Sequence, residues 1–262
     1  MSHWIVRLGM VVPSTLVFCL TGCGEPTPDA IKQISSAETD YRNQNYAAAE
    51  QKLTGYLKKY PDSEKSAQAY YLRSLCHTRR SNRVMAEADA RQAIKLSTDG
   101  QLCGNAHATL ATLLFESNRT HEALPHFKKA LASLPDKPPA DVLRFRYATA
   151  LQREGDWPEA KRQFTEVSRR YPGSDLTGHA RRALEWPHDA FSIQCGAYRD
   201  KSGAAALERK LKASGLKARQ ESRSRSGVVL HTVFVDRFNR YATAREALPR
   251  VQRVVPGAHI VP

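Results

Sequence analysis

A chain of 262 residues has room for one large domain or two modest ones. Its 40 Lys and Arg residues against 26 Asp and Glu residues give a formal net charge of +14, which indicates an acidic or polyanionic partner. Nucleic acid is the usual partner for such a charge, but the first residues predict a secreted protein and argue against that class.

Residues 1–22 have the pattern of a secretory signal peptide. Arg7 lies near the start, and the apolar run at 8–20 that follows it is too short to span a bilayer. The run ends in Leu20-Thr21-Gly22-Cys23, which resembles the lipobox of bacterial lipoproteins. The resemblance implies that Cys23 becomes the first residue and carries a diacylglycerol on its thiol. The alternative is an ordinary signal peptide with a cysteine nearby.

Acylation of Cys23 implies a lipid-anchored protein. Each buried CH₂ group contributes about 0.8 kcal/mol, so two or three acyl chains anchor a protein almost permanently. Gly24 rather than Asp follows the cysteine, and by analogy with enteric bacteria we expect sorting to the outer membrane, facing the periplasm. Residues 23–30 then form a short polar tether that keeps the folded part close to the membrane.

Residues 31–185 are predicted to be helical and to repeat every 37 residues. Four alanines keep this step, and so do four turn positions: Ala49, Ala86, Ala123, Ala160 and Pro61, Thr98, Pro135, Pro172. A fixed period of this length predicts a solenoid. Small residues at fixed places suit closely packed pairs of antiparallel helices. Four such hairpins are expected, followed by a basic capping helix at 175–184.

The repeating positions resemble the tetratricopeptide repeat. The resemblance is best in the third and fourth units, for example at Leu110-Ala111 with Phe127, and at Tyr147-Ala148 with Phe164. It implies an all-α solenoid with a concave groove that binds a peptide or a partner protein. Periplasmic repeat lipoproteins, including one in the outer-membrane β-barrel assembly machine, look similar. The alternative is a spacer that acts only as a rigid arm.

The last part of the chain predicts strand, helix, strand, strand, helix, strand. The strands are expected at 191–198, 217–222, 228–236 and 259–261, and the helices at 204–214 and 242–251. A strand–helix unit is duplicated, because an aromatic residue precedes an alanine by six positions in both halves: Tyr198 and Ala204, then Phe238 and Ala244. Two such units predict an antiparallel sheet with both helices on one face and the other face open.

These residues resemble the SPOR (sporulation-related repeat) domain. The motifs are Gln194-x-Gly196-x-Tyr198 and Val233-x-Val235-x-x-Phe238, each with its alanine. The resemblance covers residues 188–262 and implies a small α+β domain of βαββαβ, ferredoxin/RNP-like topology. Proteins of this family bind peptidoglycan and favour glycan strands stripped of stem peptides. The sequence departs from the family at Asp236-Arg237, where Gly-Pro is usual, which affects the local turn.

Strand alternation selects a candidate glycan-binding face. It turns one set of residues toward the helices, namely Phe191, Ile193, Cys195, Val233 and Val235. The opposite face then carries Ser192, Gln194, Thr232 and Phe234. A ring covers the apolar face of a pyranose, while an amide and hydroxyls bond its polar groups. The resemblance implies that the family uses this face and that a glutamine recurs at the place of Gln194. The alternatives are a solvated Gln194, and a Phe234 packed under a loop or the repeats.

Positive charge accompanies this face. Arg219 and Arg223 lie on or beside the second strand and are candidates for binding the lactyl carboxylates that peptide-stripped glycan exposes. A generally basic surface is the alternative. The same kind of sheet carries RNA in other proteins, but the aromatic pair expected for RNA is absent, and the signal segment argues against it.

No catalytic set is recognised in the sequence. The HExxH, Gly-x-Ser-x-Gly and phosphate-loop motifs are absent, and the cysteines and histidines lack metal-ligand spacing. We therefore expect no enzyme, no cofactor and no metal. After processing, Cys76, Cys103 and Cys195 remain, an odd number, and at least Cys76 and Cys195 are expected to be buried.

Together these features predict an outer-membrane lipoprotein that ties the envelope to the wall, where glycan is trimmed, as at the division septum. The alternative is an assembly scaffold of the β-barrel-assembly type, in which the repeats act and the SPOR domain only localises the protein. Residues 185–188 leave little slack between the two domains. We expect Trp186 to pack at the junction and the domains to keep a fixed orientation.

Overall fold

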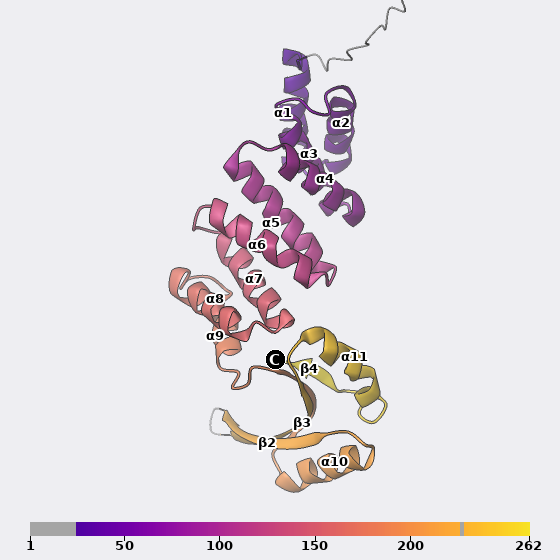
Figure 1. Ribbon diagram of the computed structural model, residues 1–262, viewed down its shortest axis with the longest axis vertical. Helices are drawn as coiled ribbons and strands as arrows, with labels where there is room; N and C mark the ends of the chain where they lie inside the picture. The colour runs from indigo at the N-terminus through magenta and orange to yellow at the C-terminus, as the bar shows by residue number, and fades with distance from the viewer. Residues whose placement is uncertain (1–24, 226–227) are drawn as a thin grey trace, which may run out of the picture.

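The computed structural model describes residues 25–225 and 228–262, so the signal segment and Cys23 lie outside the described residues. A stack of helices forms one end of an elongated molecule, and a small domain with a sheet and two further helices forms the other (Figure 1). The helices of the first end are α1 (Pro28–Arg42), α2 (Tyr46–Lys59), α3 (Ser66–Arg79), α4 (Arg83–Leu96), α5 (Gly100–Glu116), α6 (Thr120–Ser133), α7 (Ala140–Glu154), α8 (Trp157–Arg170) and α9 (Thr177–Leu184). In the described ranges, no helix combines the length and the apolar character needed to cross a membrane.

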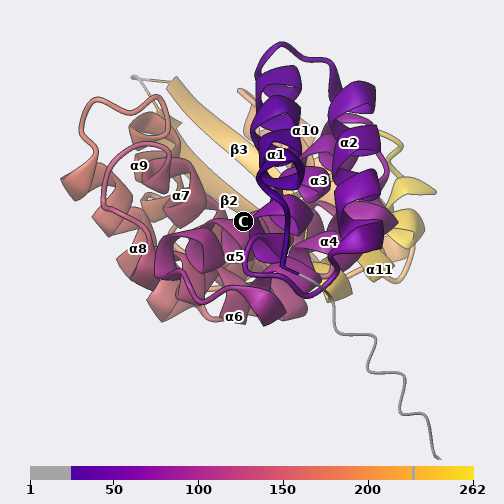
Figure 2. The ribbon, with the colours of Figure 1, turned by 90° about the horizontal axis from the view of Figure 1, so that it is seen from above.

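Helices α1 to α8 form four hairpins, and α9 packs on α8 as the expected capping helix. The four alanines of the 37-residue step, Ala49, Ala86, Ala123 and Ala160, are at most 1% exposed. Their small side chains let the helices approach closely, and larger residues such as Phe127 fill the space between neighbouring hairpins. Seen from above, the hairpins are stepped around the long axis (Figure 2). The predicted solenoid is confirmed.

Each hairpin turns through one residue with a positive φ angle. Gln44, Ser81, Asn118 and Gly155 have φ angles of 63°, 62°, 59° and 88°, and they follow the 37-residue step. The left-handed conformation reverses the chain within a turn of two or three residues, and only glycine adopts it without a steric cost. Gly155 is also close to the sheet domain, since a Cβ atom there would lie 2.6 Å from Nδ2 of Asn239.

The sheet domain contains β1 (Phe191–Tyr198), α10 (Lys201–Ala213), β2 (Ala218–Arg225), β3 (Val228–Phe238), α11 (Tyr241–Gln252) and β4 (His259–Val261). All pairings are antiparallel in the order β2-β3-β1-β4. Both helices cover the same face of the sheet (Figure 1). The predicted βαββαβ class is therefore confirmed.

The core of the sheet domain lies between the strands and these two helices. Ile193, Cys195, Val233 and Val235 point into it and are at most 8% exposed, which confirms the predicted inward register. Ala204 and Ala244, the repeated alanines, are fully buried. Burial raises the pKa of the Cys195 thiol to about 11, so the thiol stays protonated and unreactive near neutral pH. Cys76 is equally buried, in the solenoid, and its pKa is raised to about 11 in the same way.

The two ends of the molecule share a packed junction. Trp157 at the start of α8 is 3% exposed. Its ring centroid lies 4.9 Å from that of Phe191, and its indole nitrogen donates to the carbonyl oxygen of Asn239 over 3.1 Å. Arg153 of α7 lies over the ring of Tyr241, 5.1 Å from its centroid. A shared apolar contact of this kind is what a fixed domain orientation requires.

Candidate functional site

The open face of the sheet brings three predicted residues into one row. Phe234 on β3 pairs with Gln194 on β1 and with Arg219 on β2. His259 on β4 pairs with Gln194 on its other side and extends the row. The sequence analysis missed His259, although a first strand next to the last strand is what the βαββαβ order requires.

The centre of this face is covered, so the expectation of an open face is wrong there. Ser192 is 0% exposed, Phe234 2% and Thr232 8%. The ring of Trp186, from the segment between α9 and β1, lies edge-on to Phe234 with the centroids 6.1 Å apart. Covering an aromatic ring with another apolar ring is favourable in water.

Arg219 is bonded within the protein instead of facing solvent. Its guanidinium lies over the Phe234 ring, 5.2 Å from the centroid. It donates to the hydroxyl of Ser192 over 2.8 Å and to the carbonyl oxygen of Asp236 over 2.6 Å. Asp236 has a φ angle of 50°, a region that favours glycine, and it stands where the SPOR family usually has glycine. Arg219 therefore helps to hold the strained end of β3.

A carboxylate lies among the basic groups of this face. Glu221 of β2 accepts a hydrogen bond from Nε of Arg219 over 3.0 Å and contacts Nε2 of His188 at 3.0 Å, and the guanidinium of Arg237 lies 3.5 Å away. His188 belongs to the same covering segment as Trp186. The charge on this face of β2 is thus not purely positive, and any anionic ligand must approach beside Glu221.

The accessible part of the face lies toward β1 and β4. Gln194 is half-buried, while Ala197 and His259 are exposed. Ala197 reaches this face because the register shifts between Gln194 and Gly196, after which Ala197 pairs with Thr232. Arg223 lies on β2 opposite Leu230, and its side chain lies outside what the structure describes.

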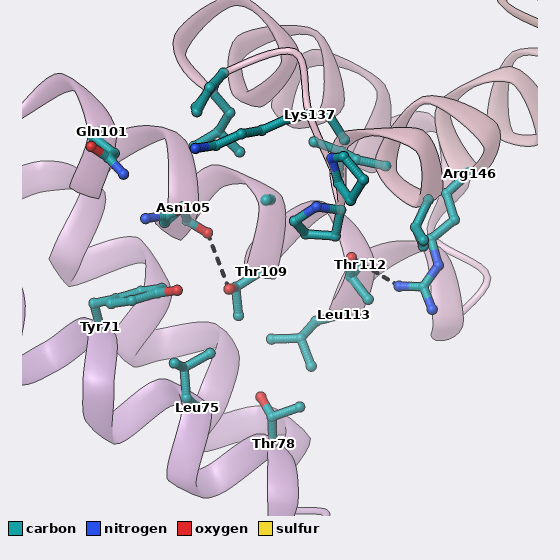
Figure 3. Close-up of a pocket in the computed structure, with 18 of the residues that line it drawn as sticks. Tyr71, Leu75, Thr78, Gln101, Asn105, Thr109, Thr112, Leu113, Lys137 and Arg146 are labelled. Atoms are coloured by element: carbon teal, nitrogen blue, oxygen red, sulfur yellow. Dashed lines mark hydrogen bonds between the residues drawn. The ribbon is translucent and has the colours of Figure 1, made fainter. Parts of the chain in front are cut away.

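A second candidate site is a groove along the first helix of each hairpin, which we call the inner groove. Its central cavity, of about 590 Å³, is lined by α3, α5, α7 and the loop at 134–139 (Figure 3). Leu75, Leu113 and Val142 contribute apolar surface, and Lys137 and Arg146 contribute positive charge. Neighbouring cavities share lining residues with it at both ends. The predicted concave groove is therefore present.

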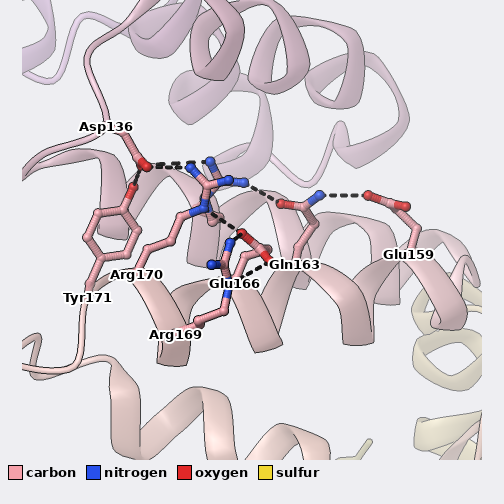
Figure 4. Close-up of polar contacts among 8 residues, drawn as sticks. Asp136, Glu159, Gln163, Glu166, Arg169, Arg170 and Tyr171 are labelled. Carbon is pink, nitrogen blue, oxygen red and sulfur yellow. Dashed lines mark hydrogen bonds and ion pairs between the residues drawn. The ribbon is translucent and has the colours of Figure 1, made fainter.

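Ion pairs hold the loop that forms one wall of the inner groove. Asp136 of this loop accepts hydrogen bonds from Arg170 and Tyr171, and Glu166 pairs with Arg169 and Arg170 (Figure 4). The hydrogen bonds from the two arginines lower the pKa of Glu166 to about 2. Those from Tyr171 and Arg170 lower the pKa of Asp136. Both carboxylates stay charged at neutral pH, so the wall keeps its position.

The histidines of the solenoid do not form a metal centre. Within residues 25–225 and 228–262, no group of three or more His, Cys, Asp or Glu side chains is placed to hold a metal ion. His107 and His126 face each other with their Nδ1 atoms 2.8 Å apart. Burial, and then the charge of His107, lowers the pKa of His126 to about 4, so the pair is neutral at pH 7 and has a packing role.

Comparison with known families separates the two ends of the chain. Residues 187–262 match the SPOR domain, and residues 114–179 match the tetratricopeptide repeat. No curated protein matches the chain.

The solenoid is also similar to solved structures. YrrB, a TPR protein with an unusual peptide-binding site, is 22% identical with a TM-score of 0.52, over 60% of this chain and 74% of YrrB. A tetratricopeptide repeat protein from Parabacteroides merdae is 14% identical with a TM-score of 0.52, over 61% of this chain and 60% of that protein. At these identities the similarity shows the fold alone.

Proposed function

We propose that this chain, in which tetratricopeptide-like repeats precede a C-terminal SPOR domain, is a non-catalytic protein that binds peptidoglycan through its sheet and a partner protein through its inner groove. Both modules belong to families that bind rather than catalyse. The observation that carries the proposal is the row of Arg219, Phe234 and Gln194 across one sheet face of the SPOR domain. We further propose that the ligand is peptide-stripped glycan, as at the division septum.

The accessible end of the row has the chemistry of a saccharide site. The amide of Gln194 can both donate and accept, as the hydroxyl and acetamide groups of a sugar require. His259 adds a ring nitrogen beside it, on the neighbouring strand. The Phe234 ring lies next to Gln194 and provides the apolar surface for a pyranose once it is uncovered.

Replacing Gln194 by alanine is expected to weaken binding to purified sacculi about five- to tenfold, because one or two hydrogen bonds to the sugar are lost. Co-sedimentation with sacculi at a series of concentrations measures the affinity. Gln220→Ala is the matched control, since Gln220 lies on β2 opposite the inward-facing Val233 and so on the helix side of the same sheet. Equal loss in both variants, or no loss in Gln194→Ala, contradicts the site.

The attachment to the membrane also belongs to the proposal. SPOR domains occur in envelope proteins that bind peptidoglycan, which supports a periplasmic location. We propose that Cys23 carries the lipid anchor and that the protein faces the periplasm from the outer membrane. The lipobox-like Leu20-Thr21-Gly22-Cys23 and the Gly24 that follows support this. The solenoid then stands between the anchor and the wall-binding sheet.

The inner groove favours a second function, that of an envelope assembly scaffold. Its cavity of about 590 Å³ is in the size range of ligand-binding pockets. In this alternative the repeats bind the partner and the SPOR domain only localises the protein.

A photo-crosslinking residue at Val142 is expected to capture a discrete partner in cells, because Val142 lines the inner groove and is 38% exposed. The same residue at Val84 is the control, since Val84 is 82% exposed and lies on α4, outside the groove lining. Mass spectrometry of the crosslinked species identifies the partner. Equal capture at both positions, or none at Val142, argues against the groove as the partner site.

A further inference from the structure

The segment that covers the sheet face, residues 186–188, comes from the linker between the solenoid and the sheet, and we call it the covering linker. We propose that the covering linker is an intramolecular competitor of the glycan: it occupies the place of a sugar ring on Phe234 and must move off before glycan binds there. This inference rests on the proposed function and concerns the regulation of the same site.

The first argument is steric. A pyranose that stacks on Phe234 needs the surface that Trp186 takes, and Phe234 is only 2% exposed with the covering linker in place. Trp186 is fixed there by a hydrogen bond from its indole nitrogen to the carbonyl oxygen of Ala190, 3.0 Å long. The ring of His188 packs against the indole with the centroids 5.8 Å apart. Two rings of the linker therefore take part in the closure.

The second argument concerns the polar groups. His188 contacts both carboxylate oxygens of Glu221, at 3.0 and 3.1 Å, and Arg219 donates to Ser192 and to the backbone of Asp236. Groups that would bond to the hydroxyl and carboxylate groups of the glycan are thus bonded within the protein. The covering linker and the side chains beneath it reproduce the aromatic and polar contacts that a saccharide would make.

The third argument is that the contacts made directly on the sheet face are individually modest. The edge-on contact between Trp186 and Phe234 is a modest interaction, and Trp186 also packs against the cluster of Trp157, Phe191 and Ala244. The His188 and Glu221 side chains remain 23% and 20% exposed, and the ion pair between Lys161 and Asp189, which ties the end of the linker to α8, is 40% and 56% exposed. The Lys161–Asp189 pair is an exposed pair, and such pairs contribute little. A protein that is open for only part of the time binds its ligand with a correspondingly reduced apparent affinity.

The closure also connects the two ends of the molecule. The covering linker follows α9 after one residue, Glu185, and Asp189 is bonded to Lys161 of α8. A shift of the last hairpin relative to the sheet would therefore move Trp186 and His188 with it. Engagement of a partner by the solenoid can in this way change how often the glycan face is open.

The test is sacculus co-sedimentation of the full chain carrying Trp186→Ala or His188→Ala, with peptide-stripped sacculi as the probe. Both changes lie on the covering linker and leave the sheet intact. They are expected to tighten binding about fivefold or more, because each removes contacts that hold the closed state. Glu185→Ala is the control, since Glu185 is exposed and outside the closure, and it is expected to bind like the wild type. His188→Ala removes a smaller side chain than Trp186→Ala does, so it remains informative if Trp186→Ala folds poorly.

The outcomes separate this inference from the proposed function. Weaker binding by Trp186→Ala and by His188→Ala would mean that the linker rings are part of the glycan site, and would overturn competition. Equal binding by all four proteins also overturns it and leaves the proposed function standing. If sacculi retain none of the four, the proposed function fails, and the competitor role fails with it.

Discussion

Replacing Trp157 by alanine is expected to lower the free energy of unfolding by about 3–5 kcal/mol, the range for deletion of a large buried aromatic side chain. Trp157 is 3% exposed, packs on Phe191 and donates to the backbone of Asn239. The same change removes the centre of the junction between solenoid and sheet. Chemical denaturation measures the stability, and small-angle scattering is expected to show a broader range of distances between the two domains.

Trp157→Phe is the conservative control for this result. It keeps an aromatic ring against Phe191 but removes the indole donor to Asn239, so a loss of about 1–2 kcal/mol is expected. The domains should keep one orientation in this variant. If Trp157→Ala leaves the scattering profile unchanged, the orientation depends on other contacts, and the role assigned to the indole is wrong.

A comparable loss is expected from Asp89→Ala in the second hairpin. Asp89 is 3% exposed and accepts two hydrogen bonds from the Arg73 guanidinium, both 2.7 Å long. Nε2 of His77 lies 3.5 Å from the same carboxylate. Removing one partner of a buried ion pair leaves the other charge without compensation, which costs about 3–5 kcal/mol. Thermal and urea unfolding monitored by helical circular dichroism measure this loss.

Two further variants test whether the loss comes from the unpaired charge. Asp29→Ala removes the partner of Lys32 in an exposed ion pair, in which the Asp29 side chain is 91% exposed. This variant is expected to change the free energy of unfolding by no more than about 0.5 kcal/mol. The double variant Arg73→Met with Asp89→Leu removes both charges and should recover much of the stability. A double variant as unstable as Asp89→Ala would show that the packing of the hairpin, not the charge, determines the result.

The repeat period and the strand alternation were sufficient to predict most of the fold. Alanines at a 37-residue step leave room for close helix contacts only if they all lie at the same place in each hairpin, and all four are buried there. Alternation likewise predicted which side of β1 and β3 faces the helices, because Ile193 lies between the polar Ser192 and Gln194, and Val233 and Val235 share one side of β3. These are local patterns, and each is repeated along the chain.

The covering of the sheet face could not be derived in this way. Alternation shows on which face Phe234 lies but not what lies over it, and Trp186 reaches it through a contact between segments far apart in the sequence. The position of Glu221 on the same face could have been predicted from the sequence, because Glu221 lies two residues from Arg219 on one strand. The register shift in β1 that turns Ala197 to the open face has no sequence signal that the alternation could show.

The turn at Gly155, between α7 and α8, has a consequence for how the length of the molecule can vary. A Cβ atom at Gly155 would lie 2.6 Å from Nδ2 and 3.1 Å from the carbonyl oxygen of Asn239. The contacts of Arg153, Trp157 and Lys161 described above come from α7 and α8. Whole hairpins ahead of α7 can therefore be inserted or deleted without disturbing how the sheet is mounted. The number of such hairpins sets the distance from the start of the solenoid to the sheet. This architecture therefore allows that distance to change in steps of one hairpin.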